Sequence, residues 1–416
     1  MGKLTCGALT AGLLIALSAC GNGNPNTLGG GGDPGNGDTS GSANGGTDPG
    51  SPGQGGTPQG QQGNGSDPNA NQNPNIDQRQ VNYGEALRTA ALKLVGDLPT
   101  LADIQSVTDA NSYAAMIDKY LADPRFVTHQ LQWWRDTLKT GQAGMQTGKG
   151  MPSYDTAATF AAEVVANDRP FTDLFTAATN TCPTFSNGTF TDASCSNGVT
   201  TAAGLLTDPG LMSQYYANMA FRRVRFVQET FVCSKFPAEF SANPQIMGAG
   251  AYTSPWPFTS ITGGASAKIN FQDTSAVICA NCHTTENHIA PLFGHFDQNG
   301  QYSATKFQVL VPSTGNPTAT LADWLPANEQ FYWRNGGTPV TDVPGLGAQI
   351  AADPAVTQCM VTREWNYAMD RGDVVNDVAT VPSVVTDPFV QDFKANGLKI
   401  KHLLKTIYTS DDFVKF

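Results

Sequence analysis

Histidine and cysteine are scarce in this chain, which has 5 histidines and 8 cysteines among 416 residues. A structural zinc site needs two pairs of soft ligands at a recurrent spacing, yet Cys279 and Cys282 form the only Cys-x-x-Cys pair of the sequence. No Ser-His-Asp arrangement and no glycine-rich phosphate loop is recognisable either. These absences argue against a zinc finger, and they leave no residue that we can name as catalytic.

Positive charge is also in short supply. The chain has 24 Lys and Arg against 35 Asp and Glu, which gives a formal net charge of −11. Nucleic acids and anionic lipid surfaces bind proteins through basic clusters. The sequence has no long segment rich in Lys or Arg, so neither is expected as a partner.

Long hydrophobic runs are absent, and the most apolar stretch lies at the N-terminus. Leu4 to Leu17 spans about 14 residues, which is too short to cross a bilayer, and it follows a positively charged Lys3. The next residues, Leu-Ser-Ala-Cys, resemble a bacterial lipobox. We therefore expect a signal peptide over residues 1–19 and a lipid on Cys20. The alternative is a secretory signal in which this cysteine is incidental.

In bacterial lipoproteins with a lipobox, the residue after the cysteine directs sorting. By this resemblance, Gly21, in place of Asp, favours anchoring of the protein in the outer membrane, on its periplasmic or cell-surface side. Residues 20–77 then contain almost no large apolar side chain. Such a segment buries too little surface to offset its chain entropy, so we expect a disordered tether. Random-coil scaling gives it a reach of about 40 Å.

Most of the remaining chain has apolar residues at helical spacing. The expected helices are 83–95, 113–121, one that carries Trp133 and Trp134, 154–166, 205–216, 217–233, 321–332, 356–369 and 390–408. Residues 182–195 differ, because two β-prone runs flank Asn187-Gly188, the favoured dipeptide of a type I′ hairpin turn. We expect a hairpin here that a Cys182–Cys195 disulfide closes, which requires an oxidising compartment.

The sequence Cys279-Ala280-Asn281-Cys282-His283 carries the clearest chemistry. Zinc lacks its second ligand pair, and a thioredoxin-like dithiol would need a βαβ context, whereas this context is helical. Covalent c-type haem attachment explains every residue. Cys279 and Cys282 would form thioethers with the haem vinyl groups, and His283 would bind the iron as an axial ligand.

The other cysteines are then nearly accounted for. Of the eight, Cys6 leaves with the signal peptide, Cys20 takes the lipid, and the hairpin and haem pairs use four, so that Cys233 and Cys359 remain. We expect a disulfide between them, although two buried free thiols remain the alternative.

Three stretches follow one another in a recognisable order: a Leu-Thr segment with an Arg-rich helix that ends at Cys233, the haem motif with its Phe296-Asp297-x-x-Gly300 tail, and a late helix with Cys359. In this order the chain resembles the planctomycete-type and myxobacterial cytochrome-like lipoproteins that have a single c-type haem motif. The resemblance implies a mainly α fold. It would consist of a helical domain over 78–200 that includes the hairpin, followed by a cytochrome c-like haem domain over 201–416.

The sixth iron ligand is less evident. Met247 lies in a Pro/Gly-containing loop of the kind that presents an axial methionine in small c-type cytochromes, so we rank it ahead of Met360, His295 and an open position. His288 is too close in sequence to His283 to reach the opposite haem face.

Two other patterns have a structural interpretation and a functional one. Arg222, Arg223 and Arg225 would lie on a solvated helix face by default, or else reach the haem propionates. Asp297, Asn299 and Gly300 resemble part of a calcium loop but lack its later carboxylates, so a polar turn is favoured.

These observations predict a membrane-anchored mono-haem c-type cytochrome that transfers electrons at the cell envelope to an unidentified redox protein. One alternative is a haem-dependent oxidoreductase, an oxidase or peroxidase, with an open axial position. Another is a surface binding lipoprotein with an accessory haem. We favour the carrier over an enzyme because one haem accepts and passes on a single electron.

Overall fold

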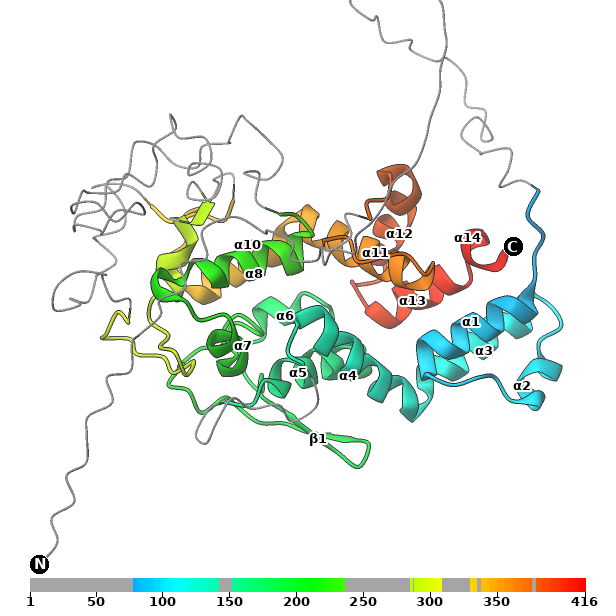
Figure 1. Ribbon diagram of the computed structural model, residues 1–416, viewed down its shortest axis with the longest axis horizontal. Coiled ribbons are helices and arrows are strands. Elements are labelled where there is room, and N and C mark those ends of the chain that lie inside the picture. Colours follow the sequence, from blue (N-terminus) through cyan, green and yellow to red (C-terminus); the bar gives the residue numbers. More distant parts are fainter. Residues whose placement is uncertain are drawn as a thin grey trace, which may run out of the picture. The chain divides into compact units, whose positions relative to one another are not determined.

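The computed structural model describes residues 78–141, 152–235, 285–286, 288–308, 330–334, 338–375 and 379–416. All of them belong to one compact unit, Asn71–Phe416. Within these residues the fold is mainly α-helical with one two-stranded antiparallel hairpin (Figure 1). The expected fold class is confirmed in these terms. The expected signal peptide and tether lie outside the described residues.

The N-terminal helices follow the apolar periodicity of the sequence. They are α1 (Tyr83–Val95), α2 (Leu101–Ser106), α3 (Ala110–Ala122), α4 (Pro124–Leu138), α5 (Asp155–Ala166) and α6 (Asp173–Thr176). α1 begins where the Asn82 side chain accepts hydrogen bonds from two backbone N–H groups, and it ends at Gly96 with φ 71°. α4 begins at an Asp123 cap followed by Pro124, and it packs along α5.

The hairpin has the expected turn and disulfide. β1 (Thr184–Ser186) pairs with β2 (Thr189–Thr191), which places Phe185 opposite Phe190. Asn187 and Gly188 both have positive φ, at 51° and 79°, as a type I′ turn requires. Just outside the two strands, Cys182 and Cys195 form a disulfide.

The later elements form the rest of the core. They are α7 (Pro209–Gln214), the 3₁₀ turns η1 (Asn218–Ala220) and η3 (Ala290–Phe293), α8 (Phe221–Val232), α10 (Val343–Ala352), α11 (Pro354–Ala368), α12 (Ser383–Ala395), α13 (Ile400–Tyr408) and α14 (Asp411–Val414).

Four expected helices differ from this arrangement. The helix over 205–216 is shorter, since α7 begins only after its Asp208 N-cap, at Pro209. The helix over 217–233 begins only at Phe221, because Met219 and Ala220 have positive φ. The helix over 390–408 is two helices, α12 and α13, separated by Gly397 with φ 71°. Of the helix over 321–332, residues 330–332 are described and are not helical, since Phe331 instead bridges Val340.

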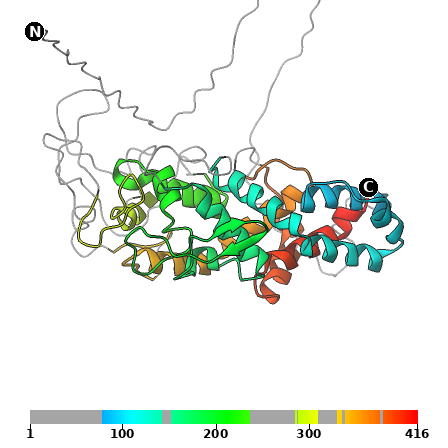
Figure 2. The ribbon, with the colours of Figure 1, turned by 90° about the horizontal axis from the view of Figure 1, so that it is seen from below.

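Helices from both expected domains share one core. α13 packs against α3 and α5, and α1 packs against α14. The two chain segments outside these helices also pair, because the backbone N–H groups of Gln80 and Phe416 donate to each other's carbonyl oxygens at 3.0 Å. Figure 2 shows α1 beside the C-terminal helices. Residues on both sides of the expected boundary at residue 200 belong to this one unit, and the boundary itself stays a prediction.

None of the helices in the described part of the chain is both long and apolar enough to span a membrane.

Candidate functional site

The haem motif itself lies outside the described residues. This applies to Cys279, Cys282 and His283, and equally to Met247 and to Cys20. The structure describes the chain up to residue 235 before the motif and again from residue 285 after it. We therefore build the site from these two flanks.

The flank before the motif ends at a disulfide. Cys233, directly after α8, bonds to Cys359 of α11 with an S–S distance of 2.05 Å and a Cα–Cα distance of 5.3 Å. Both expected disulfides are thus present, and they use all four cysteines of the described residues. Asp208 lies close to Cys182 and Cys195, but sulfurs that are bonded to each other offer no thiolate to a metal.

The flank after the motif is helical and buried. Residues 285–286 and 288–289 are helical and lead into η3. The apolar side chains of this segment that belong to the core are Ile289, Ala290, Leu292 and Phe293. His288 is completely buried, and burial raises the pKa of Glu286 to about 8. The chain is therefore buried at Glu286, three residues beyond His283, and it joins the hydrophobic core at Ile289.

Arg223 of α8 ties this flank to the rest of the fold. Its Nε and Nη2 donate to the Met212 carbonyl oxygen at 3.0 and 2.6 Å. Its Nη1 donates to the carbonyl oxygens of Phe293 and Phe296 at 3.0 and 3.1 Å, and Nη2 donates to that of Asp297 at 2.9 Å. The side chain is only 1 % exposed. The default interpretation, a solvated helix face that includes Arg223, is wrong, because these carbonyls bury its guanidinium.

The Phe-Asp-x-x-Gly tail is a structural turn. Phe296 belongs to the core, and the Asp297 carboxylate accepts hydrogen bonds from the backbone N–H groups of Asn299 and Gln301 at 2.8 and 2.9 Å. Gly300 has φ 69°, and a Cβ there would lie 2.2 Å from the Pro209 carbonyl oxygen. The favoured polar turn is thus present, and it requires glycine at this position.

His295, Met360 and the two histidines remote from the motif are all engaged within the fold. The Nδ1 atom of His295 lies 2.8 Å from the Ser303 carbonyl oxygen, and Met360 is buried in the core. His129 bonds to the Tyr367 hydroxyl at 2.8 Å, and burial lowers its pKa. His402 pairs with Asp392 at 2.7 Å.

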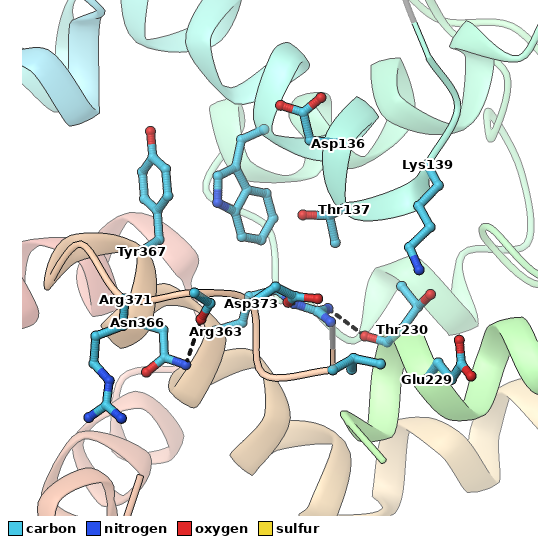
Figure 3. Close-up of a pocket in the computed structure, with 13 residues that line it drawn as sticks. Asp136, Thr137, Lys139, Glu229, Thr230, Arg363, Asn366, Tyr367, Arg371 and Asp373 are labelled. Carbon is cyan, nitrogen blue, oxygen red and sulfur yellow. Dashed lines mark hydrogen bonds and ion pairs between the residues drawn. The ribbon is translucent and has the colours of Figure 1, made fainter. Parts of the chain in front are cut away.

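A cavity of about 300 Å³ lies where α4, α8 and α11 meet. Its wall includes Arg363, whose side chain is 11 % exposed and donates to the Thr230 carbonyl oxygen at 2.5 Å and to the Asp373 carboxylate at 3.2 Å. In Figure 3, Lys139 at the end of α4 points toward α8, and Arg371 points away from Arg363. The charged residues that line the cavity are Asp136, Lys139, Glu229, Arg363, Arg371 and Asp373.

The cavity has as many acidic as basic groups along its wall, with Trp133 and Tyr367 as its aromatic residues. Asn366 uses its amide N–H to hold the loop that follows α11, donating to the carbonyl oxygens of Gly372 and Ala379 at 3.2 and 2.7 Å. Arg363 and Asn366 therefore stabilise the junction of α8, α11 and this loop.

Sequence reasoning missed these two polar residues and the burial of Arg223. For Arg223 a signal was present, because Val227 and Thr230 follow it at helical spacing and are buried with it. For Arg363 and Asn366 no comparable signal exists, because both donate to backbone carbonyl oxygens, which every residue carries.

The donor set of the motif fits covalent haem. Among the described residues no cysteine remains to pair with Cys279 or Cys282, since the other four are bonded to one another. The segment that follows the motif is buried and apolar from Ile289 to Phe293, and an apolar shell of this kind controls the access of water to a haem.

Two family models match parts of the chain. One, described as a protein of unknown function (DUF1549), matches residues 69–201, and the other, also of unknown function (DUF1585), matches residues 336–413. Both families occur in planctomycete cytochrome-like proteins. No curated protein and no solved structure matches the chain. The cavity lies between residues from the two matched segments, 133–139 and 363–375.

Proposed function

We propose that this chain is a mono-haem c-type cytochrome that carries electrons at the cell envelope. The observation that carries the proposal is the Cys279-Ala280-Asn281-Cys282-His283 motif, whose two cysteines are not used by either disulfide. A c-type haem bound there would accept one electron at a time and pass it on. The occurrence of the two matched families in cytochrome-like proteins supports the same assignment.

The location we propose is the outer membrane, with a lipid on Cys20 and the folded unit on the periplasmic or cell-surface side. The Leu-Ser-Ala-Cys sequence and Gly21 support this location. The two disulfides agree with it, because they persist in oxidising compartments. The partner is another redox protein rather than nucleic acid, in keeping with the net charge of −11.

Haem staining of the denatured protein tests the cofactor. We expect a stained band for the wild type, strong loss of stain in Cys279→Ala and Cys282→Ala, and loss of native iron ligation in His283→Ala. A hairpin variant, Cys182→Ala with Cys195→Ala, serves as the matched cysteine control and should keep its stain. A wild-type band without covalent haem would overturn the proposal.

An absorption spectrum tests the role. A carrier has six-coordinate, low-spin iron that peroxide does not alter, and methionine ligation adds a charge-transfer band in the oxidised state. That band should disappear in Met247→Ala and persist in Met360→Ala. High-spin iron that reacts with peroxide would instead assign the chain to the haem oxidoreductases.

A further inference from the structure

We propose that the cavity between α4, α8 and α11 is a binding site for a neutral sugar, either a free monosaccharide or one unit of a longer glycan. The residues named as its lining are all described by the structure, and the inference does not depend on the proposed haem. The cavity volume of about 300 Å³ lies at the lower end of the range of about 300–1,000 Å³ that small-ligand pockets have. This size suits a sugar ring better than a ligand as large as haem.

Two aromatic side chains of the cavity are fixed by their neighbours. Trp133 packs edge-to-face against Trp134, with ring centroids 4.8 Å apart. The Tyr367 hydroxyl lies 2.8 Å from Nε2 of His129, and the rings of Trp133 and Tyr367 are edge-to-face at 6.4 Å. Aromatic rings offer apolar surface to the C–H groups of a sugar. Because these rings are ordered before a ligand arrives, little side-chain entropy is lost on binding.

The charges along the cavity favour a neutral ligand. An anion would meet three carboxylates there, and a cation would meet three basic side chains. Each carboxylate also has a partner already: Gln132 donates to Asp136 at 2.9 Å, Arg225 to Glu229 at 2.7 Å and Arg363 to Asp373 at 3.2 Å. A zwitterion would compete with these partners. Sugar hydroxyls both donate and accept, so they add hydrogen bonds to such pairs without separating them.

Donors and acceptors from three elements surround the same space. Arg363 uses Nε and Nη1 for Asp373 and the Thr230 carbonyl oxygen, which leaves its Nη2 without a hydrogen-bond partner among the described residues. A carboxylate has about four lone-pair sites, so Asp373 accepts from a ligand as well. In Figure 3, Thr137 and Lys139 extend from α4 toward Asp373 and Thr230. Hydrogen bonds that involve such charged groups are stronger than those between neutral groups.

The loop that carries Asp373 is fixed in position. The Asn366 amide donates to the carbonyl oxygens of Gly372 and Ala379, on either side of Asp373 along the chain. Nη2 of Arg371 donates to the Thr380 carbonyl oxygen at 3.1 Å. The carboxylate is thus presented to the cavity before a ligand binds.

A glycan array probed with the full-length protein tests the ligand class. The array carries neutral hexose and N-acetylhexosamine oligomers together with uronic-acid and sulfated oligomers. We expect binding to neutral glycans and weaker binding to acidic ones, because acidic glycans bring negative charge to three carboxylates. Calorimetry with the best-bound glycan and with its terminal monosaccharide then identifies the source. Equal affinities assign the site to a free sugar, and a higher affinity of the oligomer assigns it to a chain.

Two conservative variants connect binding to the cavity. We expect Asp373→Asn to lower the affinity about 10- to 100-fold and Thr137→Val to lower it about 3- to 10-fold, from the usual contributions of charged and neutral hydrogen bonds. Asp118→Asn is the matched acidic control, because Asp118 is paired with Lys405 at 2.7 Å and does not line the cavity. Thr89→Val is the matched threonine control, since Thr89 is half-buried in α1. Both controls should bind as the wild type does.

Absence of binding to every neutral glycan overturns the inference, and so does a preference for acidic glycans. Wild-type affinity in Asp373→Asn is equally contrary. A thermal midpoint recorded for each variant separates loss of a contact from unfolding; if Asp373→Asn does not accumulate, Thr137→Val decides the question. Failure of the proposed function is a different result, because the wild type would then contain no covalent haem while its glycan binding is unaffected.

Discussion

Two buried ionisable groups of this fold, Arg223 and Glu364, differ in their charge state. Arg223 keeps its charge because carbonyl oxygens surround it. Glu364 of α11 is only 1 % exposed, and neither of its carboxyl oxygens has a hydrogen-bond partner among the described residues. Burial raises the pKa of Glu364 to about 8. A carboxyl group in such a place is neutral at pH 7 because the charged form would lose its hydration.

The raised pKa makes stability depend on pH in a defined direction. Between the unfolded value near pH 4.5 and the folded value of about 8, the folded state holds a proton that the unfolded state has released. The free energy of unfolding therefore falls as pH rises through this window. We expect Glu364→Gln to remove this slope, with little change at pH 5 and a gain of about 2–4 kcal/mol at pH 8.

Urea unfolding at both pH values measures the difference. Glu85→Gln is the control, because Glu85 is exposed in the first turn of α1 and its substitution should leave the pH slope as it is. Loss of stability at both pH values in Glu364→Gln would mean that the carboxylate is charged and held by a partner.

Gly300 is a second position where one residue type is required. We expect Gly300→Ala to destabilise the protein by about 1–3 kcal/mol, because it adds left-handed backbone strain and a contact of its Cβ with the Pro209 carbonyl oxygen at 2.2 Å. Gly188→Ala is the matched control, since Gly188 also has positive φ but nothing lies within 4 Å of its Cβ position. Thermal denaturation should show the larger loss for Gly300→Ala, and equal losses would contradict the close contact.

At the scale of elements, the two disulfides close loops of very different length. The Cys233–Cys359 bond has a sequence separation of 126 residues and the Cys182–Cys195 bond one of 13. In the chain-entropy model these loops correspond to about 5 and about 3 kcal/mol of stability. We expect the double substitution Cys233→Ala with Cys359→Ala to cost more than the corresponding hairpin pair, as measured by chemical denaturation. A larger loss from the hairpin pair would show that entropy of the unfolded chain is not the main term.

Helices with strong periodicity and capping residues were predictable from the sequence. α1, α3, α5 and α11 lie close to their expected positions, and the Asn-Gly turn with its flanking cysteines predicted the hairpin. The break between α12 and α13 was missed because apolar residues continue on both sides of Gly397, and a lone glycine does not reveal whether its φ is positive.

The polar contacts were less accessible to sequence reasoning. Arg363 donates to a carbonyl oxygen 133 residues away, and three of the carbonyl oxygens to which Arg223 donates are 70, 73 and 74 residues away. Backbone carbonyls are present at every residue, so no residue type marks the partner. Only the three-dimensional packing of α7, α8 and the turn at residues 293–297 determines which carbonyl oxygens the Arg223 guanidinium contacts.

At the scale of the whole molecule, the segments matched by the two family models are structurally interdependent. α3 and α5 belong to one segment and pack against α13 of the other. The backbone pairing of residues 80 and 82 with residues 414 and 416 joins the two ends of this core. The haem motif lies in the sequence between the matched segments. Cys233, which precedes the motif, is bonded to Cys359 of the second matched segment.

The membrane anchor is expected to be separable from this core. All described contacts lie within the unit Asn71–Phe416, whereas the proposed lipid is on Cys20. One acyl chain binds membranes only marginally, and several chains bind stably. We expect Cys20→Ala to move the protein from the membrane fraction to the soluble fraction, with an unchanged thermal midpoint and haem content.

Cell fractionation, followed by mass spectrometry of the mature N-terminus, measures this effect. Cys6→Ala is the matched control, because Cys6 lies within the expected signal peptide and would be removed with it, so this variant should fractionate as the wild type. Membrane retention of Cys20→Ala, or an unmodified wild-type N-terminus at another residue, would contradict lipidation. Neither result would affect the haem proposal, because the cysteines proposed to bind haem and the two disulfides lie more than 150 residues beyond the proposed anchor.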